Sequence, residues 1–145
     1  MSRKRPTQSD YERLLEFRTT LRRFLHWSDE QAERAGLTPA QHQLLLAIRG
    51  HSETEAPSIG DIAESLLVRH HSVGGLIDRA EASGLVSRRR DDIDGRIVRV
   101  ELTHLGSDRL AKLTASHLTE IAQLAGVLAE LDLSLGGDAS AGVST

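Results

Sequence analysis

Apolar residues recur at helical spacing along the N-terminal part of the chain. Between residues 9 and 34 they return every three or four positions, which is the repeat of one face of an α-helix. Gly36 follows as a helix-ending residue. The pattern predicts a helix of about 25 residues, which is long for a domain of this size. Its apolar face contains Leu14, Phe17, Leu21 and Phe24.

Two shorter helices are predicted next, each with a capping box at its start. In the first, Thr38 is a good N-cap, Pro39 suits the first helical position and Gln41 completes the box. In the second, Ser58 is the N-cap and Asp61 follows three residues later. The inward faces of the two helices contain Leu44, Leu45, Ile48, Ile62, Ala63 and Leu66.

A fourth helical segment combines apolar periodicity with two adjacent glycines. It lies in LVRHHSVGGLIDR and ends at Gly84. Its apolar positions have helical spacing and are Val73, Leu76 and Ile77. Gly74 and Gly75 occupy the middle, where each should destabilise a helix by ~1 kcal/mol relative to alanine. A function that favours glycine at these two positions would explain this cost.

After this segment the apolar period changes from 3.6 to 2, which predicts two strands. They cover residues 85–90 and 96–102, and the second alternates Val98, Val100 and Leu102 with Arg99 and Glu101. The sequence DDIDG between them is typical of a turn. The two strands and this turn therefore form a predicted β-hairpin.

A second long helix is predicted over residues 104–131, with Thr103 as its N-cap. Its apolar positions fall close to a heptad stripe. They are Leu110, His117, Ile121, Leu124, Leu128 and Leu131. His117 on this stripe is expected to be a hydrogen-bonded interface histidine. The remaining residues, 132–145, are small and polar, and we expect a disordered tail.

Composition restricts the class of protein. A chain of 145 residues has the size of one typical domain. The absence of cysteine excludes disulfides and thiolate metal sites. No apolar run approaches the ~20 residues that span a bilayer, and the basic start MSRKRPTQSDYER has no apolar stretch after it, unlike a secretory signal. We expect a cytoplasmic protein that makes no membrane contact.

Charge is distributed unevenly, although the net charge is only −3. From Arg69 to Arg99 the sequence contains seven arginines and two histidines against five acids. Such a local basic face suits DNA. Arginine is attracted into the narrow minor groove, and arginine and histidine can donate to purine N7 or guanine O6 in the major groove.

The order of elements, three helices followed by a hairpin, is that of a winged helix-turn-helix. Two helices of such a motif pack at a steep angle, and Ala63 supplies the small residue expected at their crossing. Leu67 stands where a turn glycine is common. The predicted fold class is therefore mainly α with a small β-hairpin, a winged helix-turn-helix flanked by long N- and C-terminal helices.

The region from Thr38 to Leu113 resembles the MarR family of bacterial transcription regulators. The resemblance is carried by GLTPAQHQLLLAI, by GLV.R after the fourth helix, by D-x-R in the turn and by LT..G at the last helix. It implies a homodimeric regulator that acts as a repressor and binds a pseudo-palindromic double-stranded DNA site. It implies dimerisation helices at residues 1–36 and 104–131, around a DNA-binding domain at 37–103.

The resemblance also assigns residues to the DNA. The recognition helix, residues 69–83, would enter the major groove with its front residues Arg69, His70, His71 and Ser72. In the wing, Arg96 matches the minor-groove arginine and Asp94 the carboxylate that orients it. The expected phosphate contacts are Arg79, Arg88, Arg89 and Arg90.

Gly74 and Gly75 occupy positions where the family often has polar, groove-facing residues. Our hypothesis is that the absence of side chains lets the helix approach the DNA closely. The alternative is that the glycines pack near a neighbouring backbone or loosen the helix.

Family members often bind a small aromatic or phenolic effector between the dimerisation and DNA-binding parts. The resemblance places His26, Trp27, His42 and Arg49 on the helices that border this crevice. An aromatic ring, an imidazole and a guanidinium could hold an organic anion. The alternative for Trp27 is packing at the subunit interface.

Other functions find less support in the sequence. Zinc needs three or four converging ligands, but His70 and His71 point about 100° apart on a helix and the other five histidines are scattered. No metal site or cofactor is expected, although a metal-responsive regulator is one alternative. No catalytic motif is present, so no enzyme is predicted. The other alternative is a winged helix whose basic face binds an acidic protein.

Overall fold

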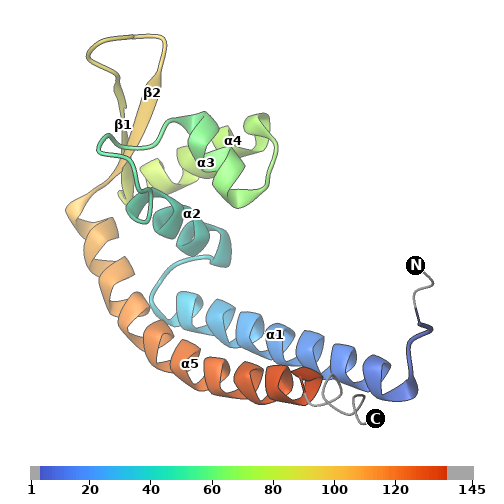
Figure 1. Cartoon of the computed structure of the whole chain (residues 1–145). Helices are drawn as coiled ribbons and strands as arrows, with labels where there is room; N and C mark the ends of the chain where they lie inside the picture. The colour runs from blue at the N-terminus through green and yellow to red at the C-terminus, as the bar shows by residue number, and fades with distance from the viewer. Residues whose placement is uncertain (1–3, 137–145) are drawn as a thin grey trace, which may run out of the picture. The chain divides into compact units, whose positions relative to one another are not determined.

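The computed structural model describes residues 4–136, and these form two compact units (Figure 1). The winged-helix unit is Asp29–Ala115, and the helical-hairpin unit comprises residues 4–28 and 116–136. The elements in chain order are α1 (Gln8–Arg34), α2 (Pro39–Arg49), α3 (Ile59–Leu66), α4 (His70–Ala82), β1 (Val86–Arg90), β2 (Val98–Leu102) and α5 (His104–Gly136). The predicted fold class, mainly α with one β-hairpin, is confirmed.

Both predicted capping boxes are present. The Thr38 hydroxyl accepts from the Gln41 backbone N–H at 3.1 Å, and the Gln41 side chain accepts from the Thr38 N–H at 3.0 Å. Ser58 and Asp61 exchange the same two bonds at 3.1 and 3.0 Å. Because a capping box joins residues only three positions apart, the starts of α2 and α3 followed directly from the sequence.

The core lies entirely in the winged-helix unit among the described residues. Its largest fully buried side chains come from α2, α3, α4, both strands and the turn between α4 and β1. They are Leu44, Leu45, Ile62, Val73, Ile77, Leu85, Val86 and Val100. As the 3% aromatic content required, this core is aliphatic. It fixes α3 and α4 against the hairpin, and so it positions the candidate site.

The β-hairpin is shorter than predicted at the start of each strand. The Leu85 N–H bonds to the Ala80 carbonyl at 3.0 Å, so Leu85 takes part in the turn that follows α4, where Gly84 has a φ of +74°. Residues 96 and 97 lie in the turn, and the Ile97 N–H bonds to Asp94 O at 3.0 Å. The strands are antiparallel and pair from Val86↔Leu102 to Arg90↔Val98.

The start of α5 is fixed against the end of α4 and the start of the hairpin. The Thr103 hydroxyl donates to Gly84 O at 2.6 Å and accepts from the Gly106 N–H at 3.1 Å. A Cβ on Gly106 would lie only 2.1 Å from Leu85 O, so this position requires glycine. These contacts explain the threonine and glycine of the LT..G motif.

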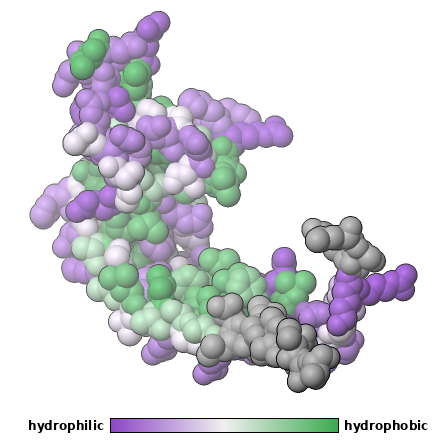
Figure 2. Space-filling model, in the orientation of Figure 1, coloured by the Kyte–Doolittle hydropathy of each residue, from purple (hydrophilic) through white to green (hydrophobic). Residues whose placement is uncertain are grey.

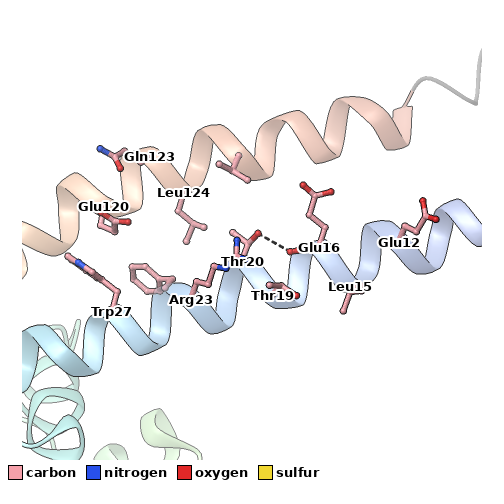
Figure 3. A pocket seen from close by; sticks show the side chains of 12 residues that line it. Glu12, Leu15, Glu16, Thr19, Thr20, Arg23, Trp27, Glu120, Gln123 and Leu124 are labelled. Atoms are coloured by element: carbon pink, nitrogen blue, oxygen red, sulfur yellow. Dashed lines mark hydrogen bonds between the residues drawn. The ribbon is translucent and has the colours of Figure 1, made fainter.

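The helical-hairpin unit has no apolar core of its own in the described part of the chain. Its two helical segments lie side by side (Figures 1 and 3). Its buried residues are Ser28 and His117, joined by a 2.7 Å hydrogen bond between Oγ and Nε2. His117 is thus hydrogen-bonded, as predicted.

α5 extends to Gly136 and so includes residues 132–136, which the sequence analysis had assigned to a disordered tail. The rest of that predicted tail, 137–145, lies outside the described residues. Within the described residues, every helix is too short or too polar to cross a membrane.

Candidate nucleic-acid interface

The turn between α3 and α4 presents the first residues of α4 to solvent. Leu67 ends α3 in the left-handed conformation, with φ 55° and ψ 38°, and the Val68 N–H returns to Ala63 O at 3.1 Å. α4 then begins after Arg69, whose side chain makes no capping bond. The side chains of this helix start, Arg69, His70, His71 and Ser72, are exposed. A helix N-terminus with exposed donors is suited to anions and to base edges.

Gly75 leaves space that Arg79 uses. A Cβ built on Gly75 would lie 3.3 Å from Arg79 Nη1. The guanidinium therefore lies back along the helix, one turn closer to its N-terminus than its own Cα. The two residues share a helix face with His71, because positions four apart are neighbours on a helix. Gly75 thus has a partner within the chain.

Gly74 has a different environment. A Cβ built there would meet no atom within 4 Å. Packing against a neighbouring backbone, one of the alternatives for this glycine, is therefore absent. Its carbonyl oxygen accepts a 3.3 Å bond from Arg88 Nη2. The close approach of DNA at Gly74 stays a prediction.

Arg88 is held by α4. Its Nη2 contacts Asp78 Oδ1 at 2.6 Å, its Nη1 contacts Glu81 Oε1 at 3.0 Å, and its backbone N–H donates to Glu81 Oε2 at 3.1 Å. We call this cluster of Arg88, Asp78 and Glu81 the β1–α4 clasp. It joins the recognition helix to the first strand of the wing and occupies the guanidinium that the sequence analysis had assigned to phosphate.

The wing tip carries an arginine oriented by a carboxylate. Arg96 Nε and Nη2 donate to the two Asp94 oxygens at 3.1 and 3.2 Å, and the Arg96 backbone N–H adds a bond of 3.1 Å. These bonds, the side-chain ones first, lower the pKa of Asp94. The Arg96 side chain is nonetheless 92% exposed. The pair that the resemblance implied is present in the molecule.

The base of the wing is organised by two residues that the sequence analysis did not select, Asp91 and Arg99. The Asp91 carboxylate accepts from the backbone N–H groups of Ile93 and Asp94 at 3.1 and 3.0 Å, and from Arg99 Nε at 3.1 Å. Arg99 also donates to Ala56 O at 3.0 Å. The hydrogen bond from Asp94, followed by that from Arg99, lowers the pKa of Asp91 to about 2.

The sequence contains a signal for the role of Asp91, but none for that of Arg99. Asp91 directly follows the first strand, in a position where aspartate commonly accepts backbone N–H groups of a turn. The bond from Arg99 to Ala56 joins residues 43 positions apart, which no local pattern can predict.

A cleft of about 510 Å³ separates the start of α3 and α4 from the wing. His70 and Arg96 both line it, together with Gly60, Asp61 and Arg99. The two residues belong to separate elements, and both were predicted to contact DNA. The cleft therefore gathers donors from the recognition helix and the wing around one opening.

The three consecutive arginines of β1 have different surroundings. Arg88 is in the clasp, and Arg89 Nε bonds to Glu101 Oε1 across the hairpin at 2.7 Å. That bond is the first cause of the raised pKa of Arg89. Arg90 donates only to Gly95 O, at 3.0 Å, among the bonds of the described residues, and it is exposed. Of the three, Arg90 is the one best placed to bind phosphate.

The four predicted effector contacts are divided between the units. His26 and Trp27 belong to the helical-hairpin unit, and His42 and Arg49 to the winged-helix unit. Trp27 lines a groove of about 660 Å³ between α1 and α5 (Figure 3). The centroid of its ring lies 6.0 Å from that of Phe24 and 4.8 Å from that of His117. Glu12, Glu16 and Glu120 also line the groove, whereas His26 does not.

Potential metal ligands do not converge in the part of the chain that the structure describes. No group of three His, Cys, Asp or Glu side chains there could hold a metal ion.

A helix-turn-helix whose recognition helix is followed by a β-hairpin with an arginine at its tip defines a winged helix-turn-helix protein. Residues 35–97 match the model of the MarR family, so this part of the chain is similar to MarR family proteins. Over 104 residues it is 27% identical to the HTH-type transcriptional repressor MdtR of Bacillus subtilis (strain 168). That match covers 72% of this chain and 65% of MdtR, so it spans less than two thirds of the relative.

Solved structures share the fold. AbsC, a MarR family transcriptional regulator from Streptomyces coelicolor, has a TM-score of 0.72 and 20% identity, over 91% of this chain and 93% of AbsC. A mutant of MepR from Staphylococcus aureus bound to an oligodeoxyribonucleotide has a TM-score of 0.65 and 22% identity, over 90% of this chain and 99% of MepR.

Proposed function

We propose that the chain is a DNA-binding transcription regulator that acts as a homodimeric repressor. The observation that carries the proposal is the cleft that His70 of α4 and Arg96 of the wing both line. Donors on two separate elements suit a duplex, which offers bases in one groove and phosphates beside it. The match of residues 35–97 to the MarR family model supports this function, as do the similarity to the transcriptional repressor MdtR and the DNA bound to the MepR mutant.

The first experiment is a fluorescence-anisotropy titration of the full chain with DNA from upstream of its own gene. It is repeated at two salt concentrations. Tight binding that weakens steeply with salt supports the proposal, because each neutralised phosphate releases counterions. If that DNA binds only non-specifically, selection from random DNA tests for an operator elsewhere. If neither the upstream DNA nor the selected DNA binds specifically, the proposal is overturned. The basic face would then bind an acidic protein.

Arg96→Ala is the matching variant. We expect it to weaken binding about tenfold or more, since the narrow minor groove attracts arginine. The thermal midpoint should stay unchanged because the side chain is 92% exposed. Lys112→Ala is the control: Lys112 is also exposed and paired with an aspartate, Asp108 at 3.2 Å, but it lies on α5. If the wild type and Arg96→Ala bind DNA with equal affinity, the wing is not part of the interface.

The homodimer is supported by burial in the helical-hairpin unit. Every fully buried apolar residue of the described chain belongs to the winged-helix unit. In the helical-hairpin unit, large apolar side chains are exposed instead, and Figure 2 shows such side chains gathered along α1 and α5. They are Tyr11, Leu14, Leu15, Phe17, Leu25, Leu118, Ile121 and Val127. A second copy would give these side chains the core that one copy lacks.

Regulation by a small aromatic effector is part of the proposal. Trp27 supports it, because this indole is half-buried at the edge of a groove that lies in the size range of small-molecule sites. The charged residues of the lining are Glu12, Glu16, Glu120 and Arg23, and this excess of acid favours a neutral or cationic compound over an organic anion. Trp27 is the single tryptophan of the chain, so quenching of its fluorescence by a candidate compound measures binding directly.

A further inference from the structure

Two glycines lie side by side in α4, but they have different neighbours. Gly74 faces open space, whereas the Cβ position of Gly75 lies 3.3 Å from Arg79 Nη1. Contacts of 3.0–3.4 Å are tighter than most that a Cβ makes. The Arg79 guanidinium therefore covers the part of the helix surface that a side chain at position 75 would cover. On this helix face, Arg79 stands in for the missing side chain of Gly75.

The acids beside Arg79 are occupied elsewhere. Asp78 and Glu81 lie one and two positions from it, yet both bind Arg88 in the β1–α4 clasp, at 2.6 and 3.0 Å. Among the described residues, Arg79 itself is exposed and forms no ion pair. The clasp thus leaves one unneutralised guanidinium on the outer face of α4.

The position of this guanidinium favours a base edge over a phosphate. It lies one helical turn closer to the N-terminus of α4 than its own Cα does, on the face of His71. The N-terminal residues of a recognition helix are the ones that contact base edges in the major groove. Arginine pairs there with guanine O6 and N7 through two parallel bonds.

We propose that Arg79 is a specificity-determining residue that contacts a guanine in the major groove, and that Gly75 is the position that seats it. The proposal rests on the DNA-binding function proposed above. It differs from the phosphate contact expected for Arg79 from the sequence. It also gives Gly75 a purpose other than close approach of the backbone to DNA.

The test begins with selection of binding sites from random DNA by the wild-type chain. For each position of the selected half-site, anisotropy then gives the affinity ratio between the best and the second-best base. Arg79→Ala should lower this ratio about tenfold or more at one guanine and leave the other positions unchanged. Arg79→Lys should not restore the ratio, because a single ammonium cannot form two parallel bonds to guanine.

A double-mutant cycle tests the role of Gly75. Gly75→Ala should lower the ratio at the same guanine in the wild-type background and have no further effect when Arg79 is alanine. Gly74→Ala is the matched control, since its Cβ enters open space; whatever its effect on affinity, the ratio at that guanine should be unchanged. Circular dichroism of each variant checks that α4 is still folded.

Each other outcome overturns a stated part. If Arg79→Ala weakens all sequences alike, lowers the salt slope by about one and is rescued by lysine, Arg79 contacts phosphate. If the effects of Gly75→Ala and Arg79→Ala on this ratio are additive, Gly75 does not position the Arg79 guanidinium. If the wild type selects no sequence at all, the regulator proposal fails and this inference fails with it.

Discussion

Leu67 has a backbone conformation that is unfavourable for any residue with a Cβ. Its φ of 55° is the one positive φ of a non-glycine residue in the described chain, and its side chain is 92% exposed. The left-handed conformation costs an L-residue roughly 1–2 kcal/mol. Because the side chain is exposed, its burial does not offset this cost. The turn between α3 and α4 imposes the conformation, because the last carbonyls of α3 bind the N–H groups that follow it.

We therefore predict that Leu67→Gly stabilises the chain. The expected gain in the free energy of unfolding is about 0.5–1 kcal/mol, since glycine removes the Cβ strain but has more freedom when unfolded. Urea denaturation followed by circular dichroism measures it. Leu67→Ala is the control because alanine keeps the Cβ and should give no such gain. A glycine variant no more stable than the alanine variant would show that the turn is not strained.

Residue by residue, the sequence was informative where partners are close along the chain. Leu67 was recognised at a position where glycine is common, and its φ is indeed positive. Thr38 and Ser58 were predicted as caps for the same reason. The partners of Arg88 could not be predicted, because Asp78 and Gly74 lie ten and fourteen residues away and meet it only after α4 packs on β1.

At the scale of elements, the wing has a rigid base and an exposed tip. Asp91 holds three donors at the base, and Arg99 connects that base to the loop before α3 through Ala56 O. The Val100 N–H adds a 3.0 Å bond to Pro57 O. The loop that contains Arg96 is therefore held in place by the bonds of Asp91 and Arg99 at its base.

The Asp91 carboxylate makes the wing sensitive to acid. Its pKa is lowered to about 2 in the folded protein from an ordinary value of 3.8. A group with a depressed folded pKa stabilises the native state above its unfolded pKa and loses that contribution as the pH falls through the folded value. We predict that stability declines between about pH 4 and pH 2, and that Asp91→Asn makes this part of the decline shallower.

Urea midpoints measured at several pH values between 5 and 2 test this prediction. Asp92→Asn is the matched control, because the neighbouring aspartate is exposed and accepts none of the recorded loop bonds in residues 4–136. Parallel pH profiles for Asp91→Asn and the wild type would assign the acid sensitivity to other carboxylates.

The elements themselves were largely predictable, and their ends less so. The 3.6-residue and two-residue periods located all helices and both strands. The first strand was predicted to begin at Leu85. In the structure the Leu85 N–H instead donates to Ala80 O and closes the turn after α4. The helix α5 continues beyond Leu131, the last position of the predicted stripe. Both differences arise where the apolar period gives no information about backbone hydrogen bonds.

At the scale of the whole molecule, the helical-hairpin unit leaves large apolar side chains exposed. Its described residues bury Ser28 and His117 but no apolar side chain fully, while large apolar residues stay exposed along both helices. Burial of such side chains stabilises by ~25 cal/mol per Å² of apolar area. We predict that the chain is a dimer at micromolar concentration and that Ile121→Glu shifts it towards the monomer, since a buried unpaired carboxylate is strongly unfavourable.

Sedimentation velocity over a range of concentrations measures this shift, and DNA anisotropy shows its consequence. A monomer contacts one half-site instead of two, so the DNA affinity of Ile121→Glu should fall although its winged-helix unit is unchanged. Leu46→Glu makes the same chemical change at an apolar residue of α2 that is 50% exposed, similar to the 45% of Ile121. It should leave the dimer intact. If Ile121→Glu sediments as the wild type does, or if the wild type is a monomer, the exposed face of the hairpin serves something other than a second copy.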